Sequence, residues 1–205
     1  MKTVKRLFRG FSFLFRSFFI EKPKGIDFSL RQKTHNIQTE GNNGYALTQK
    51  KAFDNIMKLL DISSDDKFID IGCGKGATLY YATNYPFSRI AGIEIEQSLF
   101  SIAKNNFLKL NISHVELFNE NAISFDKYDE FNVFFLFNPF SSDIYKKVFD
   151  KVTMSVANKE KVYLICYGDS PTEYIRNDGR WTLLHDYIDK VRETNVHIWL
   201  KNENK

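Results

Sequence analysis

Strand-like and helix-like patterns alternate in regular order from Leu47 onward in this 205-residue chain. The predicted strands are 67–71, 89–95, 114–118, 131–137 and 162–167, and the predicted helices are 52–60, 76–84, 97–109 and 142–157. Short apolar strands separated by helices are typical of a parallel sheet covered on both faces. The chain is therefore predicted to form an α/β fold with a doubly wound, Rossmann-like sheet.

The last part of the chain departs from this alternation. Two strand-like runs, 182–188 and 195–201, have no helix-length segment between them. We expect them to pair as an antiparallel hairpin. The full prediction is a seven-stranded mixed sheet with six parallel strands, one antiparallel strand in the C-terminal hairpin, and helices on both faces.

The charge of the chain is unevenly distributed. The formal net charge is +4, yet residues 1–20 contain five basic residues and no acidic residue. The rest of the chain has 24 of the 29 basic residues and all 25 acidic residues, so it has no overall positive charge. No nucleic-acid partner is therefore expected. The two cysteines have no spacing typical of a disulfide framework or a zinc site, which favours a reducing cytoplasmic location.

Residues 1–20 are predicted to form a basic amphipathic helix. The apolar residues at helical spacing are Val4, Leu7, Phe8, Phe11, Leu14, Phe15, Phe18 and Phe19, and the basic residues opposite them are Lys2, Lys5, Arg6, Arg9 and Arg16. The apolar stretch is too short to span a membrane, and no cleavage site follows it. Two interpretations remain open. The helix packs on its own domain, or it lies on an anionic membrane at the inner face or on a partner.

The segment that follows is polar and rich in turn residues. We interpret residues 21–44 as a linker or lid and residues 45–205 as the main domain.

The stretch FIDIGCGKG at 68–76 places Asp70 at the end of a predicted strand, directly before Gly72, Gly74 and Gly76. Glycines at this turn also occur in dinucleotide sites, so they leave a dehydrogenase open as an alternative. A carboxylate would oppose a bound pyrophosphate by about 4 kcal/mol at a separation of about 4 Å under surface-like screening. The acid therefore favours a phosphate-free ligand with a positive centre, such as S-adenosylmethionine.

With these residues, the chain resembles the class I, seven-stranded S-adenosylmethionine-dependent methyltransferases. Asp70 and the three glycines match the D-x-G-x-G-x-G motif of that family. The stretch GIEIE at 92–96 resembles the second motif, which implies that Glu94 accepts hydrogen bonds from the ribose hydroxyls. Asn121 and Ala122 stand where the family usually has Asp-Ala beside the adenine. The resemblance implies S-adenosyl-L-methionine as the cofactor and makes residues 45–205 the methyltransferase domain.

Two further stretches resemble motifs of amine-directed methyltransferases. In FLFNPF at 135–140, Asn138, Pro139 and Phe140 match an Asn-Pro-Pro-aromatic motif that lacks one proline here. The resemblance implies that Asn138 and Phe140 contact the methyl acceptor, and a strand-terminating turn is the structural alternative. In GYALTQ at 44–49, Tyr45 and Thr48 match a Tyr-x-x-Thr element of the non-SET lysine methyltransferases, where it covers the methionine end of the cofactor. A helix cap explains Thr48 equally well.

The sequence thus predicts direct in-line methyl transfer, achieved by positioning and desolvation. The acceptor is predicted to be an amine nitrogen such as a protein lysine. A small molecule or glycan acceptor is the first alternative, and a noncatalytic cofactor-binding or membrane-docking module is the second. The four histidines are scattered without metal-ligand spacing, so no metal is expected.

Overall fold

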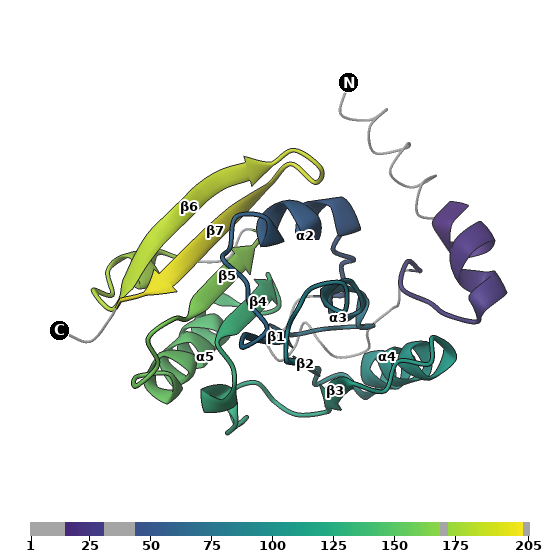
Figure 1. Ribbon diagram of the computed structural model, residues 1–205, viewed down its shortest axis with the longest axis horizontal. Helices are drawn as coiled ribbons and strands as arrows, with labels where there is room; N and C mark the ends of the chain where they lie inside the picture. Colours follow the sequence, from purple (N-terminus) through teal and green to yellow (C-terminus); the bar gives the residue numbers. More distant parts are fainter. Residues whose placement is uncertain (1–14, 31–43, 169–171, 203–205) are drawn as a thin grey trace.

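A computed structural model describes residues 15–30, 44–168 and 172–202 of the chain. It contains a seven-stranded sheet in the order β3-β2-β1-β4-β5-β7-β6 (Figure 1). The strands are β1 Lys67–Ile71, β2 Arg89–Ile93, β3 Val115–Phe118, β4 Val133–Phe137, β5 Tyr163–Tyr167, β6 Trp181–Asp189 and β7 Thr194–Lys201. The predicted doubly wound sheet is confirmed, and β2 ends two residues earlier than predicted.

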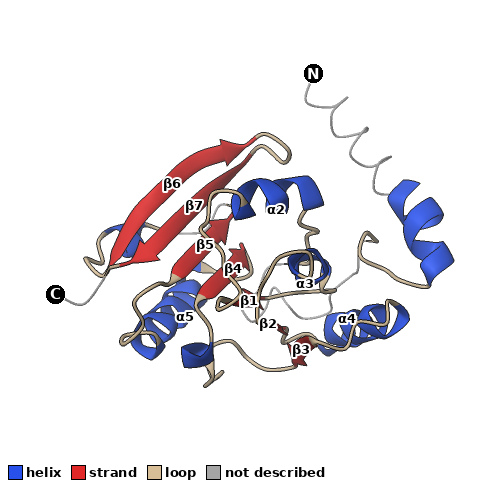
Figure 2. Cartoon of the chain, viewed as in Figure 1, coloured by secondary structure: helices blue, strands red, loops and turns tan. Residues whose placement is uncertain are grey.

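The predicted hairpin is also confirmed. Strands β1 to β5 pair in parallel, whereas β7 pairs antiparallel with both β5 and β6, so β7 is the antiparallel strand of the sheet. A register irregularity interrupts the hairpin between Leu183 and His185. The long β6–β7 hairpin stands out at one end of the molecule in Figure 2.

Helices cover both faces of the sheet. Buried side chains of α2 Lys50–Met57 and α3 Ala77–Ala82, together with Phe107 of α4 Gln97–Lys109, belong to one core cluster. Buried side chains of α5 Ser142–Ser155 belong to a second cluster, together with Ile175 of α6 Glu173–Arg176. The short helix α6 was not predicted. Successive residues of a strand enter opposite clusters, for example Phe68 and Ile69, because side chains alternate across a sheet.

The strand order brings two distant sequence motifs together. Strands β1 and β4 are neighbours, with Asp70 opposite Phe135. Since parallel strands end at the same edge, the glycine-rich turn after β1 and the Asn-Pro turn after β4 lie beside each other.

Residues 21–30, called the strap below, pack on this core. The helical turn Ser17–Glu21 leads into it, and the helical turn Lys22–Lys24 lies at its start. Phe28 is fully buried and stacks on Tyr80 with ring centres 5.6 Å apart. This half of the predicted linker or lid is therefore a packed element. Residues 1–14 of the predicted helix and residues 31–43 lie outside the described residues. Within the described part of the chain, no helix has the length and apolar character needed to cross a bilayer.

Candidate active site

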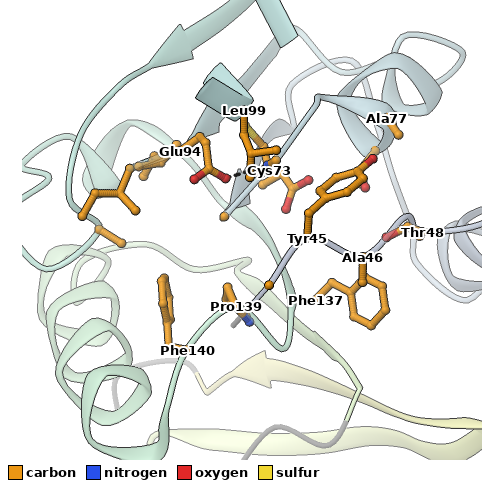
Figure 3. A pocket seen from close by; sticks show the side chains of 18 of the residues that line it. Tyr45, Ala46, Thr48, Cys73, Ala77, Glu94, Leu99, Phe137, Pro139 and Phe140 are labelled. Carbon is orange, nitrogen blue, oxygen red and sulfur yellow. Dashed lines mark hydrogen bonds between the residues drawn. The ribbon is translucent and has the colours of Figure 1, made fainter. Parts of the chain in front are cut away.

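A pocket lies beside the turns that follow β1, β2 and β4 (Figure 3). Phe137, Pro139 and Phe140 line one side of it in Figure 3, and Glu94 and Cys73 line the other. The predicted site residues that line this pocket are Tyr45, Thr48, Asp70, Gly72, Gly74, Glu94, Asn121, Ala122 and Phe140. Gly76 and Asn138 were predicted for the site as well, but they do not line the pocket.

The glycines of the turn make room for the protein's own side chains. A Cβ atom on Gly72 would lie 2.7 Å from Pro139, and one on Gly74 would lie 2.5 Å from the Tyr45 ring. Gly76 is the N-terminal cap residue of α3, and a Cβ atom there would lie 2.7 Å from Phe107 of α4. The match to the family motif predicts all three glycines as cofactor-binding residues. In the structure, Gly76 serves helix packing.

The backbone amides of the turn are already bonded within the protein. Gly72 and Cys73 both donate to the Ile93 carbonyl at 2.9 Å, and Gly76 donates to the Cys73 carbonyl at 2.9 Å. The Gly74 amide donates to a carboxylate oxygen of Glu94 at 2.8 Å. These four amides therefore form no open cradle for a phosphate, unlike the amides of phosphate-binding loops.

Two buried carboxyl groups face the pocket. Asp70 is 3% exposed and Glu94 is 7% exposed. Burial, with a smaller contribution from the nearby Glu94, raises the pKa of Asp70 to about 8 against a hydrogen bond from Thr78. Burial also raises the pKa of Glu94, although the amides of Glu96 and Gly74 bond to its carboxylate and oppose the shift. A positive ligand would relieve this shared burial of negative charge.

Tyr45 and Thr48 reach the pocket from the segment before α2. The Tyr45 hydroxyl donates to the Phe28 carbonyl at 2.6 Å, which ties the pocket to the strap. Thr48 is buried. The N-terminal cap residue of α2 is Gln49, and no side chain makes a capping hydrogen bond there. The helix-cap alternative for Thr48 is therefore wrong.

The loop after β3 contributes Glu120, Asn121 and Ala122 to the pocket. The Asn121 side-chain oxygen accepts from the Ile123 amide at 2.9 Å, so this residue also closes a local turn. Glu120 was not predicted. It supplies a carboxylate directly before Asn121, which stands where the family usually has Asp. This neighbouring position in the sequence could have pointed to Glu120.

The turn after β4 has an unusual backbone. Asn138 has φ of 41°, a left-handed conformation that is uncommon for a residue other than glycine. It stands between Phe137 and Pro139, which both line the pocket, and its Cβ atom packs against Gly168. Strained backbone of this kind often occurs at functional sites.

Pro139 of the Asn-Pro-aromatic match lines the pocket as well. The pocket contains further residues that the sequence did not single out: Gly44, Ala46, Cys73, Ala77, Thr78, Ile93, Ile95, Leu99 and Phe137. Burial and the neighbouring Asp70 and Glu94 raise the pKa of Cys73, so its thiol is a poor nucleophile. No group of three or more His, Cys, Asp or Glu side chains that could hold a metal ion occurs within residues 15–30, 44–168 and 172–202.

Comparisons with known proteins agree with this geometry. Residues 62–202 match a protein family described as "Methyltransferase domain". The chain is 29% identical over 107 residues, 51% of its own length, to the malonyl-[acyl-carrier protein] O-methyltransferase of Acetivibrio thermocellus. It is 30% identical over 97 residues, 40% of its length, to a type II restriction enzyme and methyltransferase of Heyndrickxia coagulans. The matches cover 38% and 15% of these two relatives.

The fold also has solved counterparts. An RNA methyltransferase from Salinibacter ruber, in complex with S-adenosyl-L-homocysteine, superimposes with a TM-score of 0.61 at 21% identity. The superposition covers 78% of this chain and 96% of that one. At this level of identity the likeness concerns the fold.

Proposed function

The chain belongs to the methyltransferase domain family, a class of S-adenosylmethionine-dependent methyltransferases, and we propose that it methylates an amine nitrogen, with a protein lysine as the acceptor. The observation that carries the acceptor proposal is the turn Asn138-Pro139-Phe140, held beside the pocket at the end of β4.

The residues present fit the cofactor. Asp70 and Glu94 provide buried negative charge, and the bonded amides of the turn offer no phosphate cradle. When bound, S-adenosylmethionine supplies an electrophilic methyl group on a sulfonium. Asp70 would face its amino-acid end and Glu94 its ribose, while Asn121 and Ala122, with Glu120, would lie at the adenine.

The acceptor side requires a neutral nitrogen whose lone pair is aimed at the methyl group. The side-chain oxygen of Asn138 and the backbone carbonyl oxygen of the following Pro139 would accept hydrogen bonds from that nitrogen. Phe137, Phe140 and Tyr45 would form apolar walls that exclude water and favour loss of the amine's proton. This arrangement positions and desolvates the acceptor without a strong catalytic base.

The test is transfer of a labelled methyl group from S-adenosylmethionine into a cell extract, separated into protein, glycan, lipid, nucleic-acid and small-molecule fractions. We expect label in protein, stable to mild base, on the side-chain nitrogen of lysine by mass spectrometry. Base-labile label would indicate a carboxyl ester instead. Label in small molecules or glycans, or in nucleic acid, would contradict the lysine proposal while leaving methyl transfer intact.

A variant ties the activity to the proposed turn. We expect Asn138→Ala to lower kcat roughly a hundredfold, because one of the two acceptors that orient the nitrogen is lost. Its affinity for S-adenosylhomocysteine should change little. Asn158→Ala, at an exposed asparagine after α5, is the matched control. Equal activity of both variants would remove Asn138 from the acceptor site.

A further inference from the structure

Residues 15–20, the described end of the predicted N-terminal helix, expose most of their apolar side chains. Phe15, Phe18, Phe19 and Ile20 are 50%, 52%, 69% and 47% exposed. These four, called the aromatic patch below, fall within six consecutive residues. Single exposed apolar residues need no explanation, but a contiguous group on one surface marks an interaction site.

The side of the helix that faces the domain is polar. Ser17 and Glu21 are buried, and Arg16 donates to Glu21 at 2.8 Å. The Glu21 carboxylate also accepts from the amides of Phe28 and Ser29, at 3.1 and 2.9 Å, and from the Ser29 hydroxyl at 2.6 Å. The helix thus has its polar side inward and its apolar side outward, the reverse of an ordinary surface helix.

This orientation is held in place by charge. Rolling the helix to bury the aromatic patch would move Arg16 away from the Tyr81 ring, whose centre lies 5.8 Å from the guanidinium, and would break the bonds of Glu21 to Phe28 and Ser29. A buried charge that loses its partners is strongly unfavourable. Of the two interpretations of the sequence, packing of the apolar side on its own domain therefore does not hold for Phe15, Phe18 and Phe19.

The charge around the aromatic patch is positive. The Lys22 ammonium lies 3.9 Å from the centre of the Phe18 ring, and both Lys22 and Lys24 are exposed. Glu21, the acidic residue within residues 15–24, is buried and accepts hydrogen bonds from Arg16 and from the Ser29 amide. The sequence before it adds Lys2, Lys5, Arg6 and Arg9 with no acidic residue.

We propose that the aromatic patch and its lysines dock this protein on an anionic lipid surface. Phenylalanine and isoleucine side chains insert at the boundary between headgroups and acyl chains, and flanking lysines attract lipid phosphates. The polar side of the helix, bonded to the domain, then holds the body of the protein at the membrane. The proposal is independent of the methyl acceptor.

The test is sedimentation of the full chain with vesicles of phosphatidylcholine alone and with vesicles that also contain phosphatidylglycerol. We expect binding to the anionic vesicles, weakened by added salt. Replacing Phe18 and Phe19 together by serine should weaken it by about tenfold or more. The matched control replaces exposed Met154 and Ile188 by serine, on α5 and β6.

All variants should bind S-adenosylhomocysteine like the wild type, which shows that they are folded. Equal binding by the Phe18/Phe19 variant and the control, or no binding of the wild type to anionic vesicles, would overturn the proposal. So would a dimer in solution that the Phe18/Phe19 variant abolishes, because the patch would then be covered by a second copy of the chain.

Discussion

Asp70 and Glu94 place two buried carboxyl groups at one pocket, where burial raises the pKa of both and Glu94 adds to the shift of Asp70. The protein retains them at some loss of stability, since burying charge without a cation is unfavourable. A positively charged ligand would offset this loss, because it favours the ionised form of Asp70 and so causes the carboxyl group to release its proton. The same two residues therefore make the ligand-free fold less stable and the ligand-bound state more favourable.

Replacing Asp70 by asparagine should separate these effects. The folded protein keeps the Asp70 proton up to about pH 8, whereas the unfolded chain releases it near pH 3.8. Wild-type stability therefore falls as pH rises through that window, and the variant lacks this loss. We expect the ligand-free variant to have the higher Tm, by a margin that grows from about pH 4 to about pH 8.

The same variant should bind S-adenosylmethionine at least about tenfold more weakly, because a carboxylate partner of the cationic ligand is lost. Calorimetry in buffers of different ionisation enthalpy should show proton release on binding near pH 7 for the wild type and less for the variant. A lower Tm of the variant across the whole window, with unchanged affinity, would contradict this role for Asp70.

At the scale of elements, the strap is bonded to the glycine-rich turn through Lys75. This lysine is fully buried, and its ammonium donates to Asp27 at 2.6 Å and to the Leu30 carbonyl at 2.8 Å. It also lies 5.4 Å from the centre of the Tyr45 ring, which contacts Gly74. Asn106 of α4 bridges the same groups, donating to the carbonyls of Asp27 and Lys75. The strap therefore supports Tyr45 over the pocket.

We expect Asp27→Asn to loosen the strap, since it leaves a buried ammonium without its carboxylate. Hydrogen exchange at the amides of Phe28 and Ser29 should accelerate roughly tenfold or more. Affinity for S-adenosylhomocysteine should fall as Tyr45 loses support. Asp150→Asn, which breaks the exposed Lys146–Asp150 pair, is the control. Unchanged exchange in Asp27→Asn would mean that Glu21 holds the strap by itself.

At the scale of the whole molecule, the sheet order decides which ligand the edge of the sheet can take. The ends of β1, β2 and β4 and the turns after them meet there and bring two carboxyl groups and two aromatic rings, Phe137 and Phe140, to one pocket. A dinucleotide would meet that negative charge and no open amide cradle, so the dehydrogenase alternative is disfavoured on physical grounds.

Ligand stabilisation checks this directly. S-adenosylhomocysteine at about a hundred times its Kd should stabilise the fold by about 2.7 kcal/mol, which raises Tm by several degrees for a chain of this size. NAD should leave Tm unchanged. Glu94→Gln should reduce the shift caused by S-adenosylhomocysteine. A larger shift with NAD in the wild type would restore the dehydrogenase interpretation.

Much of the fold could be predicted because its signals are local. Runs such as VFFLF and YLICY have the length and apolar character of buried parallel strands, and the lack of a helix between 188 and 195 predicts the hairpin. The motif around Asp70 could be found for the same reason, since its residues are contiguous. The ends of α2, α3 and α5 differ from the prediction by one to three residues, and the short α6 was not predicted, because tertiary contacts set them.

The sequence by itself determined the succession of strands and helices along the chain, the acid beside the glycine-rich turn and the basic character of the N-terminus. These follow from backbone periodicity and turn chemistry, which act between near neighbours in the chain. Only the tertiary structure decided that Gly76 faces Phe107, that Lys75 pairs with Asp27, and that Arg16 turns inward while Phe18 turns out. These contacts depend on which residues distant in the sequence can pair with a buried charge or fill a space in the core. The local sequence pattern does not identify those partners.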